Sequence, residues 1–432
     1  MKKTKSLWYL IPISIITTMM VIHLTSIQIF NSQPFIPKSE IFPIVIPTYQ
    51  EHFHLNIQFL ESFVKNVDDF SNILILFIVS NRNEVKSLLK LIYTNPVLIE
   101  AFQIHEGGLY IESLFDVISK VDGIDLRNEP LIFNDIHIQE DNLLELVQKY
   151  KYQSIKKLYG IRYLDTIIPH YQYALMADSE FKCIKPNTLF HNTVQDYFYN
   201  SKIKLFYQDF RHGQMNLIKQ LVQEIMDFIH VNVHVLPSDT TYMLQDQSWF
   251  VQRDIYHGFW NYLEGINQTS ILRRIYDNPG NALFGDLAYR YYIYTNDFPG
   301  KDRYEFVDVI QQFKTQKGVS PAAYNLILKD QLKNGKYGAF EEISWFPKSL
   351  TSHLVDFLNT NKIAFFRNEG NEECFLYKLS KSVETMRYQA CSDAYFPISD
   401  GYCKALEETE LQAERDSLAD LHQEEKRLQT AL

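Results

Sequence analysis

Residues 42–48 read FPIVIPT and residues 72–79 read NILILFIV, and these two stretches decide the fold that the sequence predicts. Each is an almost continuous apolar run of strand length, and each is followed by loop-forming residues, Pro47-Thr48 after the first and Ser80–Asn83 after the second. Between them, apolar side chains recur at helical spacing from Leu55 to Val64. A strand, a helix and a second wholly apolar strand indicate a parallel sheet with crossover helices.

Further along the chain the same alternation continues. The sequence predicts helices over Asn142–Leu164 and Gln214–Ile229, and strands over Tyr171–Ala177, Val231–Leu236 and Trp249–Val251. Residues Leu287–Thr295 fit either a helix or a strand. The predicted fold class is therefore α/β, with a mostly parallel, Rossmann-like sheet flanked by helices. In that sheet Ile44–Ile46 and Leu74–Val79 are expected to be adjacent parallel strands.

The amino-terminal region contains a segment long enough to cross a membrane. Residues Leu7–Phe30 form a run of 24 residues without Asp, Glu, Lys or Arg, and a helix of that length spans a hydrocarbon core. Lys2, Lys3 and Lys5 precede it and the next charge is Lys38, which predicts a single-pass type II signal anchor with a cytosolic amino terminus. The globular part is then expected in the secretory lumen, in the Golgi or the endoplasmic reticulum. The alternative is a cleaved signal peptide, whose apolar stretch is usually shorter.

Composition divides the chain into five parts: a cytosolic tail (1–6), a transmembrane helix (7–30), a short stem (31–40), one large globular domain (41–403) and a charged carboxyl-terminal segment (404–432). The last part holds eight acidic and four basic residues with leucines at broken heptad spacing. It is predicted to be a solvated amphipathic helix, because two broken heptads fall short of a coiled coil. The alternative is a zipper that forms a homodimer.

Charge and cysteine content exclude some classes of function. The formal net charge is −10 and no basic stripe follows the first five residues, which argues against nucleic-acid binding. Cys374, Cys391 and Cys403 lie close enough in sequence for one disulfide in a lumenal domain, but the pair is not determined. Their spacing is not that of a zinc site.

The strongest chemical signal is the stretch Ala174–Glu180, which reads ALMADSE. In an open parallel sheet, ligands bind beyond the carboxyl ends of the strands, where the strand order reverses. Asp178 and Glu180 follow a predicted strand at a spacing of two, so both carboxylates can reach into such a crevice. Paired carboxylate oxygens suit Mg²⁺ or Mn²⁺, which take their remaining ligands from water and a substrate diphosphate. The plainer interpretation is a polar loop after a core strand.

This combination of a D-x-E motif at a strand end, an opening apolar strand ending in Pro-Thr and an amino-terminal anchor resembles the GT-A glycosyltransferases. The resemblance covers Ile41 to Thr295 in outline. It implies a GT-A-like fold, a nucleoside-diphosphate sugar as donor, and a glycan, glycoprotein or lipid as acceptor. It further implies that Asp178 and Glu180 hold the divalent metal, while Pro47, Thr48 and Tyr49 line the nucleotide pocket. Glu180 departs from the second Asp of the family's D-x-D motif.

The resemblance extends to residues on either side of the motif. Lys156 and Arg162 belong to the helix before the Tyr171 strand and would contact the donor diphosphate; the alternative is a solvated basic face. Asp286, with Asp246 second, would act as general base on the acceptor hydroxyl, although Asp286 also suits a helix N-cap. The remaining candidates, each of which could be a third metal ligand, are His257 and His353.

Other chemistries lack their motifs. The sequence contains no G-x-x-x-x-G-K-[ST] phosphate-binding loop, no G-x-S-x-G nucleophile elbow and no H-E-x-x-H zinc motif. The leading hypothesis is thus a metal-dependent glycosyltransferase. The alternative is a non-catalytic, membrane-tethered binding or scaffold protein derived from such a domain, and the two differ in whether Asp178 and Glu180 converge on a crevice.

Overall fold

The computed structural model describes residues 41–308 except 69, 104–107, 129, 180, 184–201, 210–215, 244–247 and 281–282, together with residues 311–312, 351–360, 365–368, 382, 388–391, 412, 415–416 and 419. The predicted anchor Leu7–Phe30, the stem and most of residues 404–432 lie outside this part. Cys374 and Cys403 lie outside it too. Among the residues that are described, no helix combines the length and apolarity needed to cross a bilayer.

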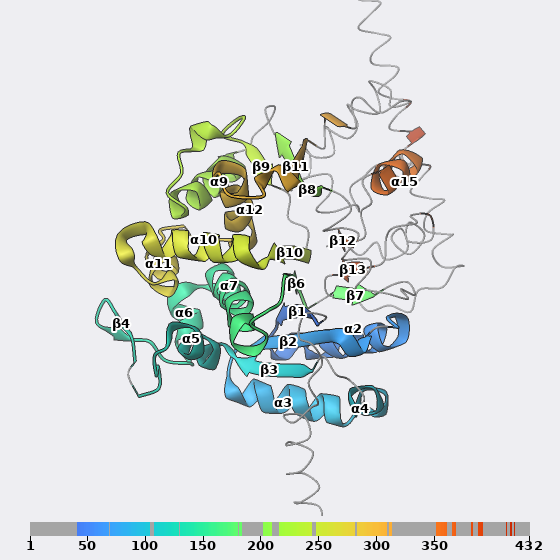
Figure 1. Cartoon of the computed structure of the whole chain (residues 1–432), viewed down its shortest axis with the longest axis vertical. Coiled ribbons are helices and arrows are strands. Elements are labelled where there is room, and N and C mark those ends of the chain that lie inside the picture. Colours follow the sequence, from blue (N-terminus) through green and yellow to red (C-terminus); the bar gives the residue numbers. More distant parts are fainter. Residues whose placement is uncertain are drawn as a thin grey trace, which may run out of the picture.

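The central sheet has five strands in the order β10-β6-β1-β2-β3 (Figure 1). Four of them are parallel, and β10 runs antiparallel to β6 at one edge. The strands are β1 (Phe42–Pro47), β2 (Ile73–Val79), β3 (Leu109–Ser113), β6 (Tyr173–Ala177) and β10 (Ser248–Gln252). The predicted mostly parallel α/β sheet is therefore confirmed.

The two strands predicted to be adjacent are paired. Ile44 lies opposite Ile75 and Ile46 opposite Phe77 in a parallel register, and every residue of both strands is buried. Both faces are apolar because helices cover both. Each fully buried Ile or Leu side chain contributes roughly 1.5–3 kcal/mol relative to exposure.

Helices α2 (Phe53–Asn66) and α7 (Lys149–Ile167) cover opposite faces of this pair of strands. Phe77 contacts Phe59 of α2, with ring centroids 6.3 Å apart, while its neighbour Ile78 faces α7. Gly160 lets α7 approach closely, since a Cβ there would lie 2.8 Å from Cγ1 of Val45. Successive strand residues point to opposite faces, which explains the division between the two helices.

The remaining helices surround this core, and two smaller sheets and a hairpin complete the described fold (Figure 1). The helices are α3 (Arg82–Tyr93), α4 (Pro96–Gln103), α5 (Leu114–Asp122), α6 (Leu143–Val147), α9 (Asn216–Phe228), α10 (Arg253–Gly265), α11 (Ile271–Asp277), α12 (Gly285–Thr295) and α15 (Thr351–Thr360). The smaller sheets are β11-β8-β9 and β12-β13-β7, from β7 (Phe181–Cys183), β8 (Ile203–Asp209), β9 (Thr241–Met243), β11 (Tyr304–Asp308), β12 (Phe365–Asn368) and β13 (Tyr388–Cys391). The hairpin pairs β4 (Ile132–Phe133) with β5 (Ile136–His137).

Two predicted elements differ from the structure, and the structure decides a third that the sequence left open. The long helix over Asn142–Leu164 is divided into α6 and α7, because Gln148 adopts a left-handed φ of 67° that ends the first helix. The predicted strand Val231–Leu236 is wrong: its centre is a short 3-10 helix, Val233–Val235, without a buried residue. The ambiguous stretch from Leu287 is helix α12, in which every residue from Gly285 to Ile293 is buried. A helix buried on all sides shows no amphipathic period.

Candidate functional site

The carboxyl ends of β1 and β6 meet at the point where the strand order of the central sheet reverses. From β1 the chain builds outward through β2 and β3, and β6 is then added on the other side of β1. Val45 lies opposite Met176, so the same register continued brings Thr48 level with Ser179. Crevices at such reversal points are where open α/β sheets bind ligands. We use the name crevice for the strand ends around Thr48, Tyr49, Asp178 and Ser179, because they lie at this reversal point.

Polar side chains gather where β1 ends. Thr48 is buried; its amide donates to the carbonyl of Ile78 at 2.9 Å, and its hydroxyl donates to Oδ1 of Asn56 at 2.6 Å. The hydroxyl of Tyr49 lies 2.6 Å from Nε2 of His52, and the two rings are in contact, with centroids 4.1 Å apart. The strand end thus presents an ordered polar surface with one half-buried aromatic ring.

The D-x-E motif begins where β6 ends. The Asp178 side chain is 25% exposed, and its Oδ1 lies 3.0 Å from the ammonium of Lys157 on α7. Ser179 is buried, with its hydroxyl 2.6 Å from Nδ1 of His52. Glu180 lies outside the described residues. The structure therefore brings Asp178 beside the predicted nucleotide residues Thr48 and Tyr49.

Lys156 lies beneath the crevice. Its ammonium donates to the carbonyl of Thr48 at 2.6 Å and to the hydroxyl of Ser80 at 3.0 Å, so it joins the ends of β1 and β2. It also lies 5.0 Å from the ring centroid of Tyr152. Burial lowers the pKa of Lys156 to about 7, because a charged ammonium loses its hydration there. Lys156 is therefore not part of a solvated basic face.

The described residues at the crevice fit a divalent cation that is held largely by its substrate. Asp178 offers a partly exposed carboxylate, the hard oxygen ligand that Mg²⁺ and Mn²⁺ prefer, next to a second carboxylate in the sequence. No group of three or more His, Cys, Asp or Glu side chains suited to a metal occurs in the described part of the chain. A site of this kind needs the oxygens of a diphosphate or water to complete it.

A further carboxylate orders the loops at the crevice. Glu84, in the first turn of α3, accepts from the amide of Ser80 at 2.7 Å and from the amide of Gln50 at 3.3 Å. Asn81 caps the same helix by accepting from the amide of Glu84 at 3.0 Å. The loops after β1 and β2 are thus held to each other through one side chain, which the sequence analysis did not identify.

Arg162 lies at the opposite edge of the sheet from Lys156. Its guanidinium contacts Asp165 at 2.6 Å and Nε2 of His257 at 3.0 Å. Asp165 also accepts from Arg253, whose amide bonds to Gln172 just before β6 begins. The structure therefore separates Arg162 and His257 from the predicted nucleotide and metal residues.

Of the two candidate general bases, Asp286 and Asp246, only Asp286 lies in the described part of the chain. Asp286 is buried in the first turn of α12, and the N-cap of that helix is Phe284, so its interpretation as an N-cap is wrong. The amide of Gly285 donates to the hydroxyl of Ser154 at 3.1 Å, which attaches the start of α12 to α7 one turn before Lys157. Asp246 lies outside the described residues, and His353 belongs to α15.

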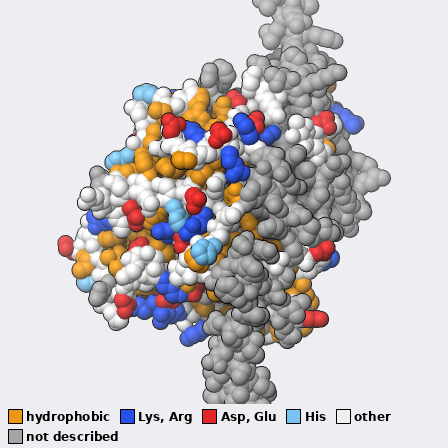
Figure 2. Space-filling model, viewed as in Figure 1, with side chains coloured by type: hydrophobic (Ala, Val, Ile, Leu, Met, Phe, Trp, Pro, Cys, Tyr) orange, Lys and Arg blue, Asp and Glu red, His pale blue; other side chains and the backbone are white. Residues whose placement is uncertain are grey.

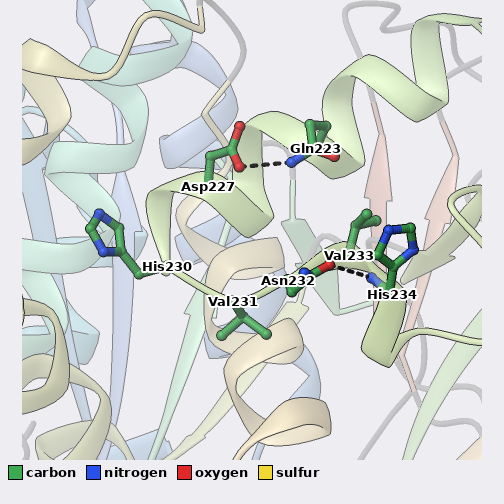
Figure 3. Close-up of a pocket in the computed structure, with 7 residues that line it drawn as sticks. All are labelled: Gln223, Asp227, His230, Val231, Asn232, Val233 and His234. Atoms are coloured by element: carbon green, nitrogen blue, oxygen red, sulfur yellow. Dashed lines mark hydrogen bonds between the residues drawn. The ribbon is translucent and has the colours of Figure 1, made fainter.

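A cavity of about 560 Å³ lies elsewhere, at the carboxyl end of α9 (Figure 3). Its lining is mostly polar and includes Asp227, His230 and His234, and the side-chain amide of Gln223 donates to Oδ1 of Asp227 at 2.7 Å. Helix α9 packs against β9 and α12 rather than against β1 or β6. This cavity is therefore separate from the crevice. Figure 2 shows basic and acidic side chains interspersed on one face of the molecule, as the sequence composition suggests.

Sequence reasoning did not identify His52, Asn56 and Glu84. His52 and Asn56 are four residues apart at the start of α2, a spacing that puts two side chains on the same helix face. In the sequence, His52 and Asn56 come shortly after the predicted nucleotide residues Thr48 and Tyr49. The signal was therefore present as two polar side chains at helical spacing within a mostly apolar segment.

Comparisons with known proteins give the following. No family model matches the sequence, and no curated protein matches it. Solved structures similar to it include mouse xyloside xylosyltransferase 1, with 10% identity and a TM-score of 0.31 over 62% of this chain and 86% of that one. Core-mannan synthase A from Aspergillus fumigatus in a Mn/GDP form has 11% identity and a TM-score of 0.37 over 64% and 75% of the two chains. The mannosyltransferase Ktr4p from S. cerevisiae has 14% identity and a TM-score of 0.36 over 64% and 70%. All three are GT-A-type glycosyltransferases, the family that the sequence resembles. At TM-scores this low, the likeness decides neither the substrate nor the reaction of this chain.

Proposed function

We propose that this protein is a glycosyltransferase of GT-A type, which transfers a sugar from a nucleoside-diphosphate donor to a glycan, glycoprotein or lipid acceptor. The observation that carries the proposal is the set of polar and charged side chains at the strand-order reversal. There the predicted nucleotide residues Thr48 and Tyr49 meet the predicted metal ligand Asp178, above the buried amine of Lys156. On sequence alone we also propose that Leu7–Phe30 anchors the domain in the secretory pathway.

Different residues of the crevice would bind different parts of the donor. Tyr49 offers a half-buried ring to the nucleotide, while Thr48 and Lys156 form the floor. A divalent cation on Asp178 and Glu180 would neutralise the charge that develops on the departing diphosphate. Lys157 already balances the charge of Asp178. Its flexible ammonium can turn toward a diphosphate that reaches the same carboxylate.

Asp286 remains the proposed general base. A buried carboxylate at the start of α12, attached to α7 next to the segment that carries Lys156 and Lys157, suits the acceptor side of the crevice. Its role would be to hold the acceptor hydroxyl and accept its proton as the bond to the sugar breaks. Asp246 is the second candidate.

The alternative is a binding or scaffold protein without transfer activity. The charged side chains of Asp178 and Lys157 and the buried amine of Lys156 at these strand ends support the enzyme, because a diphosphate donor and its metal need charged partners there. The two proposals differ in a simple measurement. Thermal unfolding of the purified domain with a panel of UDP and GDP sugars, with and without Mn²⁺, should show Mn²⁺-dependent stabilisation by at least one donor. No stabilisation by any donor would leave the scaffold as the better description.

A further inference from the structure

Ser179, the middle residue of the D-x-E motif, is bound from two directions by helix α2 and the turn before it. Its hydroxyl lies 2.6 Å from Nδ1 of His52, and its carbonyl accepts from Nδ2 of Asn56 at 3.5 Å. Ser179 is only 4% exposed and Asn56 is fully buried. Water therefore competes little for the contact that Asn56 makes.

The same two side chains hold the two residues that follow β1. Nε2 of His52 lies 2.6 Å from the hydroxyl of Tyr49, and Oδ1 of Asn56 accepts from the hydroxyl of Thr48 at 2.6 Å. Two bridges therefore cross the crevice, one through Tyr49, His52 and Ser179 and the other through Thr48, Asn56 and Ser179. Each predicted nucleotide residue is joined to the motif through one intermediate side chain.

The contacts described in both bridges can form between neutral groups. A neutral imidazole has one N–H and one lone pair, and a hydroxyl can donate or accept, so either tautomer of His52 satisfies both of its contacts. The amide of Asn56 likewise donates through Nδ2 and accepts through Oδ1. Buried polar networks that are satisfied in this way fix side-chain and backbone positions.

We propose that His52 and Asn56 are positioning residues that couple nucleotide affinity to divalent-metal affinity. A nucleotide that orders Tyr49 and Thr48 would, through these bridges, also order the loop that carries Asp178. By linkage, metal bound at Asp178 would raise nucleotide affinity by the same factor. The inference rests on the proposed donor-binding function and goes beyond it, because neither side chain needs to touch the donor or the metal.

The test compares His52→Ala, in the turn before α2, with a matched control two residues further on, in α2. His54 is also a histidine, but it is exposed and its Nδ1 lies 2.9 Å from the carbonyl of Glu51, away from Ser179. Dissociation constants of GDP and UDP would be measured by calorimetry with and without Mn²⁺, and those of Mn²⁺ with and without the nucleotide. We expect a coupling factor of at least about fivefold in the wild type and in His54→Ala. In His52→Ala we expect the coupling factor to fall by about twofold or more, while the part that comes from direct ligation of the metal by the diphosphate remains.

Two more variants separate the contacts. The amide of an asparagine can replace Nδ1 of a histidine, so His52→Asn should keep the Ser179 contact and retain part of the coupling. Tyr49→Phe removes one hydroxyl and should weaken the coupling less than His52→Ala. Hydrogen exchange without any ligand gives an independent readout: amides of the segment 174–183 should exchange faster in His52→Ala than in His54→Ala.

The outcomes distinguish this inference from the proposed function. If the wild type binds neither nucleotide, both are wrong. If the wild type binds a nucleotide with Mn²⁺-dependent affinity and His52→Ala shows the same coupling factor and the same exchange, the positioning role alone is wrong. A fall in coupling with faster exchange around Ser179 supports it.

Discussion

Helix α7 carries basic side chains to both edges of the central sheet, Lys156 and Lys157 to the carboxyl ends of the strands and Arg162 toward the amino ends. At the amino edge Asp165 is bound by Arg162, Arg253 and His257, so its charge is balanced within the protein. At the carboxyl edge, Lys156 contacts only neutral oxygens among the hydrogen bonds described, and Asp178 is partly exposed. Asp165 thus has three partners within the protein, whereas Asp178 has the one described partner Lys157 and keeps a side chain that is 25% exposed to a ligand. The comparison teaches that a polar cluster becomes a candidate site where its charged groups remain accessible.

The largest expected effect comes from replacing Asp by Asn at the carboxyl edge, and the same replacement at the amino edge is its control. Asp178→Asn should lower sugar transfer by about 100-fold or more, because the amide no longer carries the charge that a hard cation requires. The melting temperature should change little, since the ion pair with Lys157 is partly solvated. Activity and melting temperature would be measured with and without Mn²⁺.

Asp165→Asn is the matched control and should behave in the opposite way. It weakens the contacts of Asp165 with Arg162, Arg253 and His257, so we expect a loss of about 1–3 kcal/mol in unfolding free energy. Nucleotide binding should persist. Mn²⁺-dependent transfer retained in Asp178→Asn, or lost in Asp165→Asn without unfolding, would contradict the contrast between the edges.

Between the two edges, Gly160 sets how close α7 lies to the sheet. In Gly160→Ala the new methyl group would lie 2.8 Å from Cγ1 of Val45 and 3.2 Å from Cγ1 of Ile78. Overpacking costs about 1–3 kcal/mol, partly offset by the better helix propensity of alanine. We expect urea unfolding to show a net loss of about 1–2 kcal/mol. Gly265→Ala, where no atom lies within 4 Å of the added Cβ, should show no such loss.

The pH dependence of nucleotide binding should come from the carboxyl edge. Because burial holds the pKa of Lys156 at about 7, its charged form is lost as the pH rises through 7. A bound diphosphate favours the charged form, so the affinity for GDP or UDP should fall by up to about tenfold per pH unit above 7. Calorimetry at several pH values would show this in the wild type and not in Lys156→Met.

Lys151→Met provides the control for that experiment. Lys151 is also a buried lysine of α7, and burial lowers its pKa too, but its ammonium donates to the carbonyl of Asn278, away from the crevice. Its replacement should leave the pH profile of nucleotide binding unchanged. An unchanged profile in Lys156→Met would show that Lys156 is a structural residue only.

The smallest effect is expected for Arg162→Lys at the amino edge. The guanidinium contacts both Asp165 and His257 through one nitrogen, and the side chain is 30% exposed, so its replacement should cost about 0.5–1 kcal/mol. Nucleotide dissociation constants should equal those of the wild type. A weaker nucleotide affinity, measured by calorimetry, would place Arg162 among the donor-binding residues after all.

The sequence predicted the parts of this fold that depend on short-range patterns. Wholly apolar runs identified β1 and β2, and the loop after β6 placed Asp178 at a strand end. The sequence pattern did not show that Lys156 and Arg162 lie at opposite edges of the sheet. Six residues of helix cover about 9 Å along the axis, which carries the second side chain to the other edge. Which edge a helix residue serves depends on how the helix crosses the sheet, and no local pattern encodes that crossing.

The contacts across the crevice were missed for a related reason. His52 lies 127 residues from Ser179 in the sequence, and their pairing follows from the position of β6 beside β1. The strand expected over Val231–Leu236 is wrong because Val233–Val235 forms a short turn of 3-10 helix, in which Val233 is partly buried and Val235 is exposed. Apolar alternation predicts a strand only where a neighbouring strand is available to pair with it.

Helix α12 has a consequence for how the molecule unfolds. Its residues from Gly285 to Ile293 have no solvent face, and the helix packs against α7 of the central layer and against α9 and β9 of the neighbouring layer. Neither layer can therefore melt alone without exposing the apolar and aromatic side chains of α12. The two layers should behave as one cooperative unit, with a single calorimetric transition in which α12 is among the last segments to release its amide protons.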